Sequence, residues 1–100
     1  CAIVDYNGYQ IDGKVCEIMN LEPLIAKWQA FGWHTIEIDG HNMRQILSAY
    51  QQAKETTDKP AVIIAHTIKG KGVSFMENVV DFHGRAPTKE EAERALKELE

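Results

Sequence analysis

The feature that most constrains the fold of this chain is the run Ala61-Val-Ile-Ile-Ala65, in which five apolar residues follow one another without a polar one. Strands with one solvated face alternate apolar and polar residues, whereas strands buried on both faces form continuous apolar runs. Lys59-Pro60 introduces the run, and His66 follows it. The run therefore predicts a strand of a parallel sheet whose two faces are both covered.

Strand and helix patterns alternate along the rest of the chain. A short β-branched run predicts a strand over 1–6, and alternating residues predict another over 33–38. Apolar residues at helical spacing predict helices over 21–31 and 43–56, and the capping box Thr88-Lys-Glu-Glu91 opens a third helix. The predicted fold is therefore α/β, a partial parallel-sheet βαβ fold in the order β-α-β-α-β-long loop-α.

Polar residues and glycines near the helix ends supply candidate caps. Asn20 is the candidate N-cap of the helix over 21–31, and Gly32 is its candidate C-terminal stop. The break Asp39-Gly-His-Asn42 precedes the next helix, and His41 is a candidate cap there.

Three turn-like dipeptides each follow a predicted strand: Asn7-Gly8, Asp39-Gly40 and Lys69-Gly70. The strands of a parallel sheet share one carboxyl edge, and ligands of open α/β sheets bind beyond that edge. All three dipeptides are therefore candidates for a binding site.

The segment Asn7–Gly13 allows two interpretations. Asn-Gly between β-forming residues is the strongest short signal for a hairpin. Alternatively, a strand ends here at a site that binds a ligand. The βαβ order favours the second interpretation, because no convincing partner strand follows Gly13 before the chain enters a helix.

The 19 residues from Lys69 to Pro87 have little periodicity, and loops of that length in compact domains are usually functional or disordered. Ile68-Lys-Gly-Lys-Gly-Val-Ser74 is similar to a phosphate-binding loop but lacks P-loop spacing, so a solvated turn is the alternative. His83 is a candidate catalyst, with a surface or capping role as the alternative. For His66, a hydrogen-bonded and partly buried histidine is the simpler interpretation.

Composition and charge exclude several classes of protein. With a net charge of −4, the chain lacks the electrostatic footprint of a nucleic-acid-binding protein. No apolar run approaches the roughly 20 residues that span a bilayer. Cys1 and Cys16 form no disulfide framework, which favours a reduced, cytoplasmic setting. Because the chain starts with Cys inside a predicted strand, we expect it to be part of a longer domain.

Taken together, these motifs resemble those of transketolases, which are thiamine-diphosphate-dependent enzymes. Val4–Gly13 is similar to the second half of the thiamine-diphosphate motif, which begins with Gly-Asp-Gly. Trp28–Trp33 with Ile38–His41 resembles the next helix–strand unit of that family. Lys59–Asn78, followed by Phe82-His-Gly84, closely resembles bacterial and archaeal transketolase N-terminal subunits. The likeness covers nearly the whole chain.

The resemblance implies roles for individual residues near the start of the chain and in the long loop. The Asn7 side chain and the Tyr9 backbone carbonyl would bind Mg²⁺ (or Ca²⁺), which neutralises the cofactor diphosphate. Ile11 would pack against the thiazolium ring. His83 would be the catalytic histidine, near the diphosphate and the substrate channel.

Three further residues near the third strand receive weaker assignments from the same resemblance. His66 would contribute to cofactor binding. Lys69 and Lys71 would lie near the entrance of the active site and reach the substrate phosphate.

The resemblance also implies the setting in which such a site would work. Residues 1–100 would be the C-terminal portion of a thiamine-diphosphate-binding domain, with the upstream Gly-Asp-Gly part absent from them. A pyrimidine-binding (C-terminal) transketolase subunit would complete the active site in an oligomer, so the 100 residues alone are expected to be inactive. The reaction would transfer a two-carbon ketol unit between sugar phosphates.

Two alternatives remain open at this point. One is another thiamine-diphosphate enzyme, such as a deoxyxylulose-phosphate synthase or a 2-oxoacid dehydrogenase component. The other is a non-catalytic remnant that associates with a partner and binds no cofactor.

Overall fold

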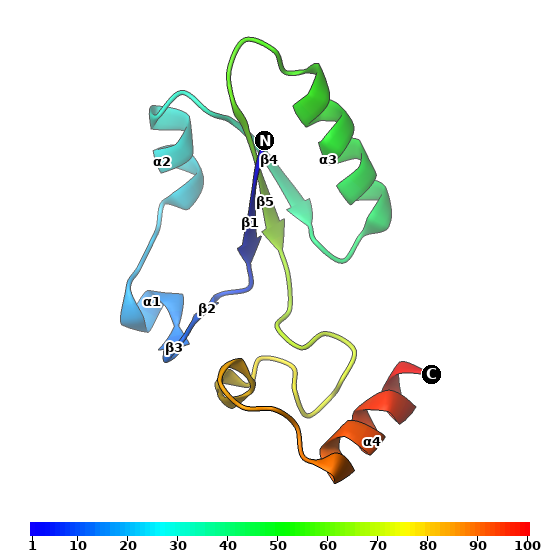
Figure 1. Ribbon diagram of the computed structural model, residues 1–100. Helices are drawn as coiled ribbons and strands as arrows, with labels where there is room; N and C mark the ends of the chain where they lie inside the picture. The colour runs from blue at the N-terminus through cyan, green and yellow to red at the C-terminus, as the bar shows by residue number, and fades with distance from the viewer.

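The computed structural model describes all 100 residues, and at its centre is a parallel sheet of three strands in the order β1-β5-β4 (Figure 1). β1 spans Ala2–Tyr6, β4 spans His34–Asp39 and β5 spans Ala61–His66. The predicted strand over 61–65 is confirmed as the central one, because β5 lies between the other two and its first five residues are buried.

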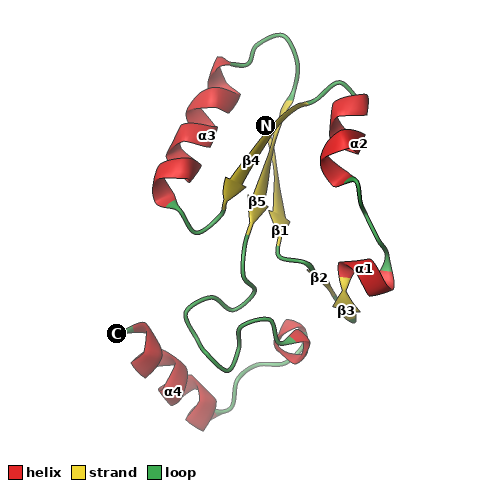
Figure 2. Cartoon of the chain, turned by 180° about the vertical axis from the view of Figure 1, so that it is seen from behind, coloured by secondary structure: helices red, strands yellow, loops and turns green.

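Helices cover both faces of this sheet. α3 (Met43–Glu55) packs on one face, where its fully buried Ala49 joins a core of strand residues: Ile36, Ile38, Ile63 and Ala65. α2 (Leu24–Ala30) lies on the other side of the sheet (Figures 1 and 2). Leu24 and Ile25 line a cavity there together with Ile64, which points away from the α3 face because neighbouring residues of a strand alternate.

The segment after β1 contains a short hairpin that the sequence did not predict, whereas the hairpin weighed there, with the first strand as an arm and Asn7-Gly8 as its turn, does not form. β2 (Tyr9–Gln10) pairs antiparallel with β3 (Gly13–Lys14), so the expectation that no partner strand follows Gly13 is wrong. The tip of the hairpin is Ile11-Asp12 rather than Asn7-Gly8. A ladder of two residues on each side is too short to show the alternation that predicts strands.

The predicted N-cap Asn20 is also wrong, because the helical region is divided. A four-residue helix, α1 (Val15–Ile18), comes first, and α2 begins only after Pro23. The Asn20 side chain accepts a hydrogen bond from the backbone N–H of Glu22 instead. The Glu22 carboxylate accepts from the first N–H of α2 at 3.0 Å. Gly32, with φ of +82°, ends α2 as predicted.

The two C-terminal helices begin at side-chain caps. The Asn42 side chain accepts hydrogen bonds from the second and third backbone N–H groups of α3, so Asn42 and not His41 is the cap. The predicted capping box of Thr88 and Glu91 is confirmed at the start of α4 (Lys89–Leu99).

The long loop after β5 lies beyond the carboxyl ends of the strands and leads to α4 (Figure 1). It contains one short 3₁₀ helix, η1 (Val80–His83). The hairpin of β2 and β3 lies at the same end of the sheet (Figures 1 and 2). None of the helices has the length and the apolar composition that crossing a membrane requires.

Candidate functional site

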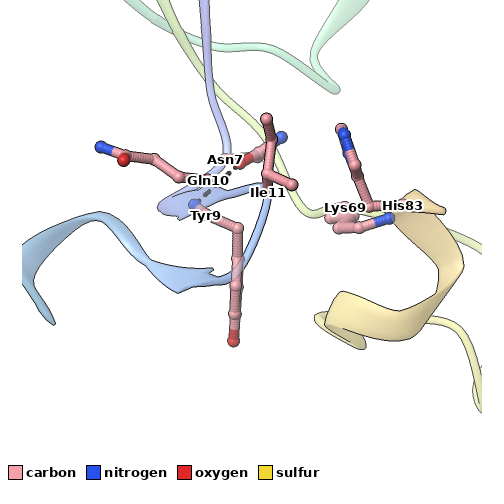
Figure 3. Close-up of a pocket in the computed structure, with 6 residues that line it drawn as sticks. All are labelled: Asn7, Tyr9, Gln10, Ile11, Lys69 and His83. Carbon is pink, nitrogen blue, oxygen red and sulfur yellow. Dashed lines mark hydrogen bonds between the residues drawn. The ribbon is translucent and has the colours of Figure 1, made fainter. Parts of the chain in front are cut away.

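The loops that follow β1 and β5 meet at the carboxyl edge of the sheet. Tyr6 and His66 are partners in the parallel register, so the two loops start next to each other. Between them is a pocket of about 400 Å³ (Figure 3). It is lined by residues from both loops: Asn7, Tyr9, Gln10 and Ile11 from the first, and Lys69 and His83 from the second. Five of the residues singled out in the sequence are therefore brought together.

Gln10 is the lining residue that the sequence did not single out. It stands between Tyr9 and Ile11, and its side chain points away from His83 (Figure 3). The Gln10 side chain donates to the carbonyl of Met19 at 2.9 Å, in the segment after α1. Only its position between two candidate residues could have drawn attention to it.

One side of the pocket, which we call the Asn7 wall, is formed by residues 7–11. Hydrogen bonds within a short segment determine its shape. The Asn7 side-chain oxygen accepts from the backbone N–H of Tyr9 at 2.9 Å, which is an Asx turn. Gly8 lies inside this turn with φ of +78°. The Gly8 carbonyl accepts from the N–H of Val15 at 2.9 Å. The turn and the hairpin place Ile11 at the pocket with 68% of its surface exposed.

This wall offers oxygen atoms and one apolar side chain. The ring of Tyr9 points away from His83 (Figure 3), so the backbone is the part of Tyr9 that can serve the pocket on that side. Amide and carbonyl oxygens suit a hard cation such as Mg²⁺, and the Asn7 oxygen keeps a second lone pair beside its turn hydrogen bond. No three His, Cys, Asp or Glu side chains gather to hold a metal ion anywhere in the chain, the pocket included.

The opposite side of the pocket, which we call the Lys69 wall, is formed by the loop over residues 68–83 that carries Lys69 and His83. The carbonyl of Lys69 accepts from the N–H of Asn78 at 2.9 Å, which joins the two ends of the segment between them. Gly70 has φ of +73°, and a Cβ atom there would lie 2.6 Å from the carbonyl oxygen of Met76. The chain then enters η1, whose last residue is His83. Lys69 and His83 lie next to each other, across the pocket from Asn7 (Figure 3).

Aromatic and ionic contacts connect η1 to its surroundings. The rings of Phe75 and Phe82 meet edge-on with centroids 6.1 Å apart, and the Arg85 guanidinium lies 4.1 Å from the Phe82 ring centroid. Arg85 also donates two hydrogen bonds to Glu91 in α4, at 2.7 and 2.8 Å. These bonds are the main reason why the pKa of Glu91 is lowered to about 2. The position of His83 therefore depends on α4 as well as on the loop.

A side-chain hydrogen bond to the segment before α2 also holds the end of β1. The hydroxyl of Tyr6, directly before Asn7, donates a hydrogen bond to the carboxylate of Glu22. This bond raises the pKa of Tyr6 and lowers that of Glu22, because it favours the protonated hydroxyl and the ionised carboxylate. It ties the strand end that presents Asn7 to the segment before α2.

His66 and Lys71 do not line the pocket. His66 Nε2 lies 2.8 Å from a carboxylate oxygen of Glu37, and its ring meets that of Tyr6 edge-on with centroids 5.3 Å apart. Lys71 Nζ lies 3.7 Å from the carboxylate of Glu77. The roles that the resemblance implies for these two residues remain predictions.

Comparisons with known proteins agree with one another. The family model described as "Transketolase, thiamine diphosphate binding domain" matches residues 1–99. The 6-deoxy-6-sulfo-D-fructose transketolase subunit SqwG of Clostridium sp. (strain MSTE9) is 52% identical over 99% of this chain and 36% of its own length. An apulose-4-phosphate transketolase subunit of Phocaeicola vulgatus is 42% identical over 98% of this chain and 35% of its own length. The chain thus spans about a third of these relatives.

Solved structures give the same result for the fold. Transketolase from Campylobacter jejuni superposes with a TM-score of 0.86 at 33% identity. The match covers 95% of this chain and 15% of that chain.

Proposed function

Since this chain belongs to the transketolase family and matches its thiamine-diphosphate-binding domain, we propose that it serves the transfer of a two-carbon ketol unit between sugar phosphates. The observation that carries the proposal is the pocket at the carboxyl edge of the sheet, where the Asn7–Ile11 segment faces Lys69 and His83. The names of these relatives favour this reaction over those of other thiamine-diphosphate enzymes.

The residues of the pocket fit part of a site for thiamine diphosphate and a divalent cation, since oxygen ligands but no carboxylate line it. Lys69 would lie near the negative charge of the diphosphate. The side chain of Asn7 and the carbonyl of Tyr9 would hold Mg²⁺ (or Ca²⁺), since both are hard oxygen ligands. Ile11 exposes an apolar side chain against which the thiazolium ring would pack. When bound, the cofactor supplies the electron sink that cleavage of the carbon–carbon bond needs.

His83 is the residue of the pocket that we propose to move protons. It lies at the end of η1 and lines the pocket beside Lys69. Each ring nitrogen of a neutral imidazole either donates or accepts a hydrogen bond, so His83 can orient a substrate hydroxyl and exchange a proton with it.

A partner subunit belongs to the same proposal. The two relatives are named as transketolase subunits, which supports an oligomer in which a pyrimidine-binding (C-terminal) subunit completes the site. The cation Lys69 at the pocket supports a phosphorylated sugar as substrate. The setting would be cytoplasmic and reducing, where the free and exposed Cys16 persists as a thiol.

The test combines the complete subunit that contains these residues with its partner subunit, thiamine diphosphate and Mg²⁺. We expect ketol transfer from a ketose phosphate to an aldose phosphate, and we expect His83→Ala to lower kcat by about 100-fold. Calorimetry should show that the His83 variant still binds the cofactor. Decarboxylation of a 2-oxoacid in place of ketol transfer would favour another thiamine-diphosphate enzyme. Absence of any cofactor binding by the assembled protein would favour a non-catalytic module.

A further inference from the structure

We infer that His41 is a positioning residue for the Lys69 wall of the pocket. Its Nε2 atom accepts a hydrogen bond from the backbone N–H of Ile68 at 2.8 Å. His41 follows β4 and does not line the pocket, whereas Ile68 directly precedes Lys69. The imidazole thus joins the β4–α3 turn to the root of the loop that carries Lys69. The inference rests on the proposed function, because it concerns how that pocket is built.

The β4–α3 turn is fitted closely to the chain that leaves β5. The N–H of Gly40 donates to the carbonyl of His66 at 2.8 Å. A Cβ atom at Gly40 would lie 2.5 Å from Cγ2 of Thr67 and 3.1 Å from that same carbonyl oxygen. The N–H of His41 donates to the Asp39 carboxylate at 2.9 Å, which holds the backbone of His41 in the turn. The imidazole is therefore presented to Ile68 by a turn that has little freedom to shift.

The hydrogen bond requires one particular form of the imidazole. Nε2 accepts only when it carries no proton, so the ring must be neutral with its proton on Nδ1. An imidazolium has N–H groups at both positions and could not accept from Ile68. The bond therefore specifies both the orientation and the tautomer of His41.

Backbone hydrogen bonds within the loop connect Ile68, which His41 holds, to the residues that line the pocket. The carbonyl of Ile68 accepts from the N–H of Lys71 at 3.2 Å, and the carbonyl of Lys69 accepts from Asn78 at 2.9 Å. Asn78 lies two residues before η1, which ends at His83. Thr67, directly before Ile68, is held by the long bond from its N–H to the Tyr6 carbonyl, at 3.4 Å, and by a hydrogen bond from its hydroxyl to the Asp5 carboxylate, but neither bond engages Ile68 itself. Loss of the imidazole acceptor would therefore loosen the wall that holds Lys69.

A matched pair of amide substitutions tests the inference in the complete subunit that contains these residues, assembled with its partner subunit. In His41→Gln, the side-chain oxygen reaches about as far as Nε2 and can accept from Ile68. In His41→Asn, the oxygen is about one bond too short, although Asn suits a turn and should preserve the fold. We expect His41→Asn to weaken binding of thiamine diphosphate with Mg²⁺ by about 5- to 10-fold, which is the effect of one hydrogen bond, and His41→Gln to restore it to within about twofold.

Exchange of the Ile68 amide hydrogen gives a readout that does not depend on activity. It should be fast in His41→Asn and slow in the parent and in His41→Gln. Asn42→Ala serves as a control in the same turn, because it removes the cap of α3 and should lower stability without changing either readout. Slow exchange and normal binding in His41→Asn would overturn the inference, and so would a failure of His41→Gln to rescue. If the assembled parent protein binds no thiamine diphosphate or transfers no ketol unit, the proposed function fails as well; if only the His41 result is negative, the proposed function stands.

Discussion

The loop after β1 and the loop after β5 supply opposite walls of one pocket, but different kinds of contact hold them. The Asn7 wall depends mainly on bonds between residues close in sequence, such as Asn7 with Tyr9 and Gly8 with Val15, and its most distant side-chain bond joins Tyr6 to Glu22. The Lys69 wall depends on residues far away in the sequence, such as His41, and on the α4 helix. A wall built from local bonds tolerates change elsewhere in the domain, whereas a wall built from distant contacts moves whenever its supports move.

Substitutions at two glycines, one in each wall, should give the largest difference in stability between the walls. Gly8 and Gly70 both have positive φ, but a Cβ atom at Gly8 would meet nothing within 4 Å, whereas at Gly70 it would lie 2.6 Å from the Met76 carbonyl oxygen. We expect Gly8→Ala to cost about 1–2 kcal/mol from backbone strain alone. Gly70→Ala should cost about 3 kcal/mol or more, because a backbone atom must also move. Urea unfolding measures both, and equal losses would show that the Lys69 loop adapts freely.

The same difference between local and distant contacts explains which parts of the structure the sequence predicted. The apolar run over 61–65 is a local pattern, and it correctly predicted the buried central strand β5. The Thr88 capping box is equally local and was also predicted correctly. His41 was expected to cap α3, but its partner Ile68 lies 27 residues further on, where no spacing rule could find it. Strands and helix caps can be predicted from neighbouring residues, whereas a contact between two loops can be predicted only when the order of the strands in the sheet is known.

The errors near the start of the chain have a related cause. The helix over 21–31 was predicted from apolar spacing, but Glu22 and Pro23 delay its start until Leu24. The β2–β3 ladder is two residues long on each strand, which is too little for a pattern. The shared carboxyl edge of the strands pointed to Asn7 and Lys69, which line one pocket, but also to Asp39-Gly40, which does not line it. The other candidates in the pocket came from the family resemblance, and their roles remain predictions. The pairing of Lys71 with Glu77 depends on how the loop folds back, and the sequence did not show it.

The next test concerns Asn7, whose side chain both closes the turn and would bind the metal. Asn7→Ala should lower affinity for thiamine diphosphate with Mg²⁺ by at least about 10-fold, while unfolding free energy changes by about 1 kcal/mol from one lost hydrogen bond. Asn7→Asp keeps an oxygen acceptor for the N–H of Tyr9 and a metal ligand, so it should retain binding. Calorimetry at several Mg²⁺ concentrations separates these results. Equal affinity in Asn7→Ala and the parent would remove Asn7 from the metal site.

The loop carries two lysines, Lys69 and Lys71, and substituting each one separately compares a charge at the pocket with a charge outside it. Lys69 lines the pocket, whereas Lys71 is half-exposed and pairs with Glu77. Lys69→Ala should raise KM for the sugar phosphate, or weaken cofactor binding, by about 10-fold, as expected for loss of a charged hydrogen bond. Lys71→Ala should change either quantity by less than about threefold, because exposed ion pairs contribute little. A larger effect at Lys71 would show that its side chain leaves Glu77 when substrate binds.

The smallest expected effect is a pH dependence of the support that α4 gives to this wall. The pKa of Glu91 is about 2 in the folded chain because Arg85 and the Thr88 N–H donate to its carboxylate, against an ordinary value of 4.5. A lowered folded pKa contributes stability that is fully present above the unfolded value and is lost as pH falls through the folded one. Protection of the α4 amides, corrected for intrinsic exchange rates, should therefore decline between about pH 4.5 and 2. In Glu91→Gln only the part due to Glu98 should remain, since hydrogen bonds from Ser74 also lower the pKa of Glu98. An undiminished decline in Glu91→Gln would assign the pH dependence to other groups and leave the Arg85–Glu91 pair without a part in it.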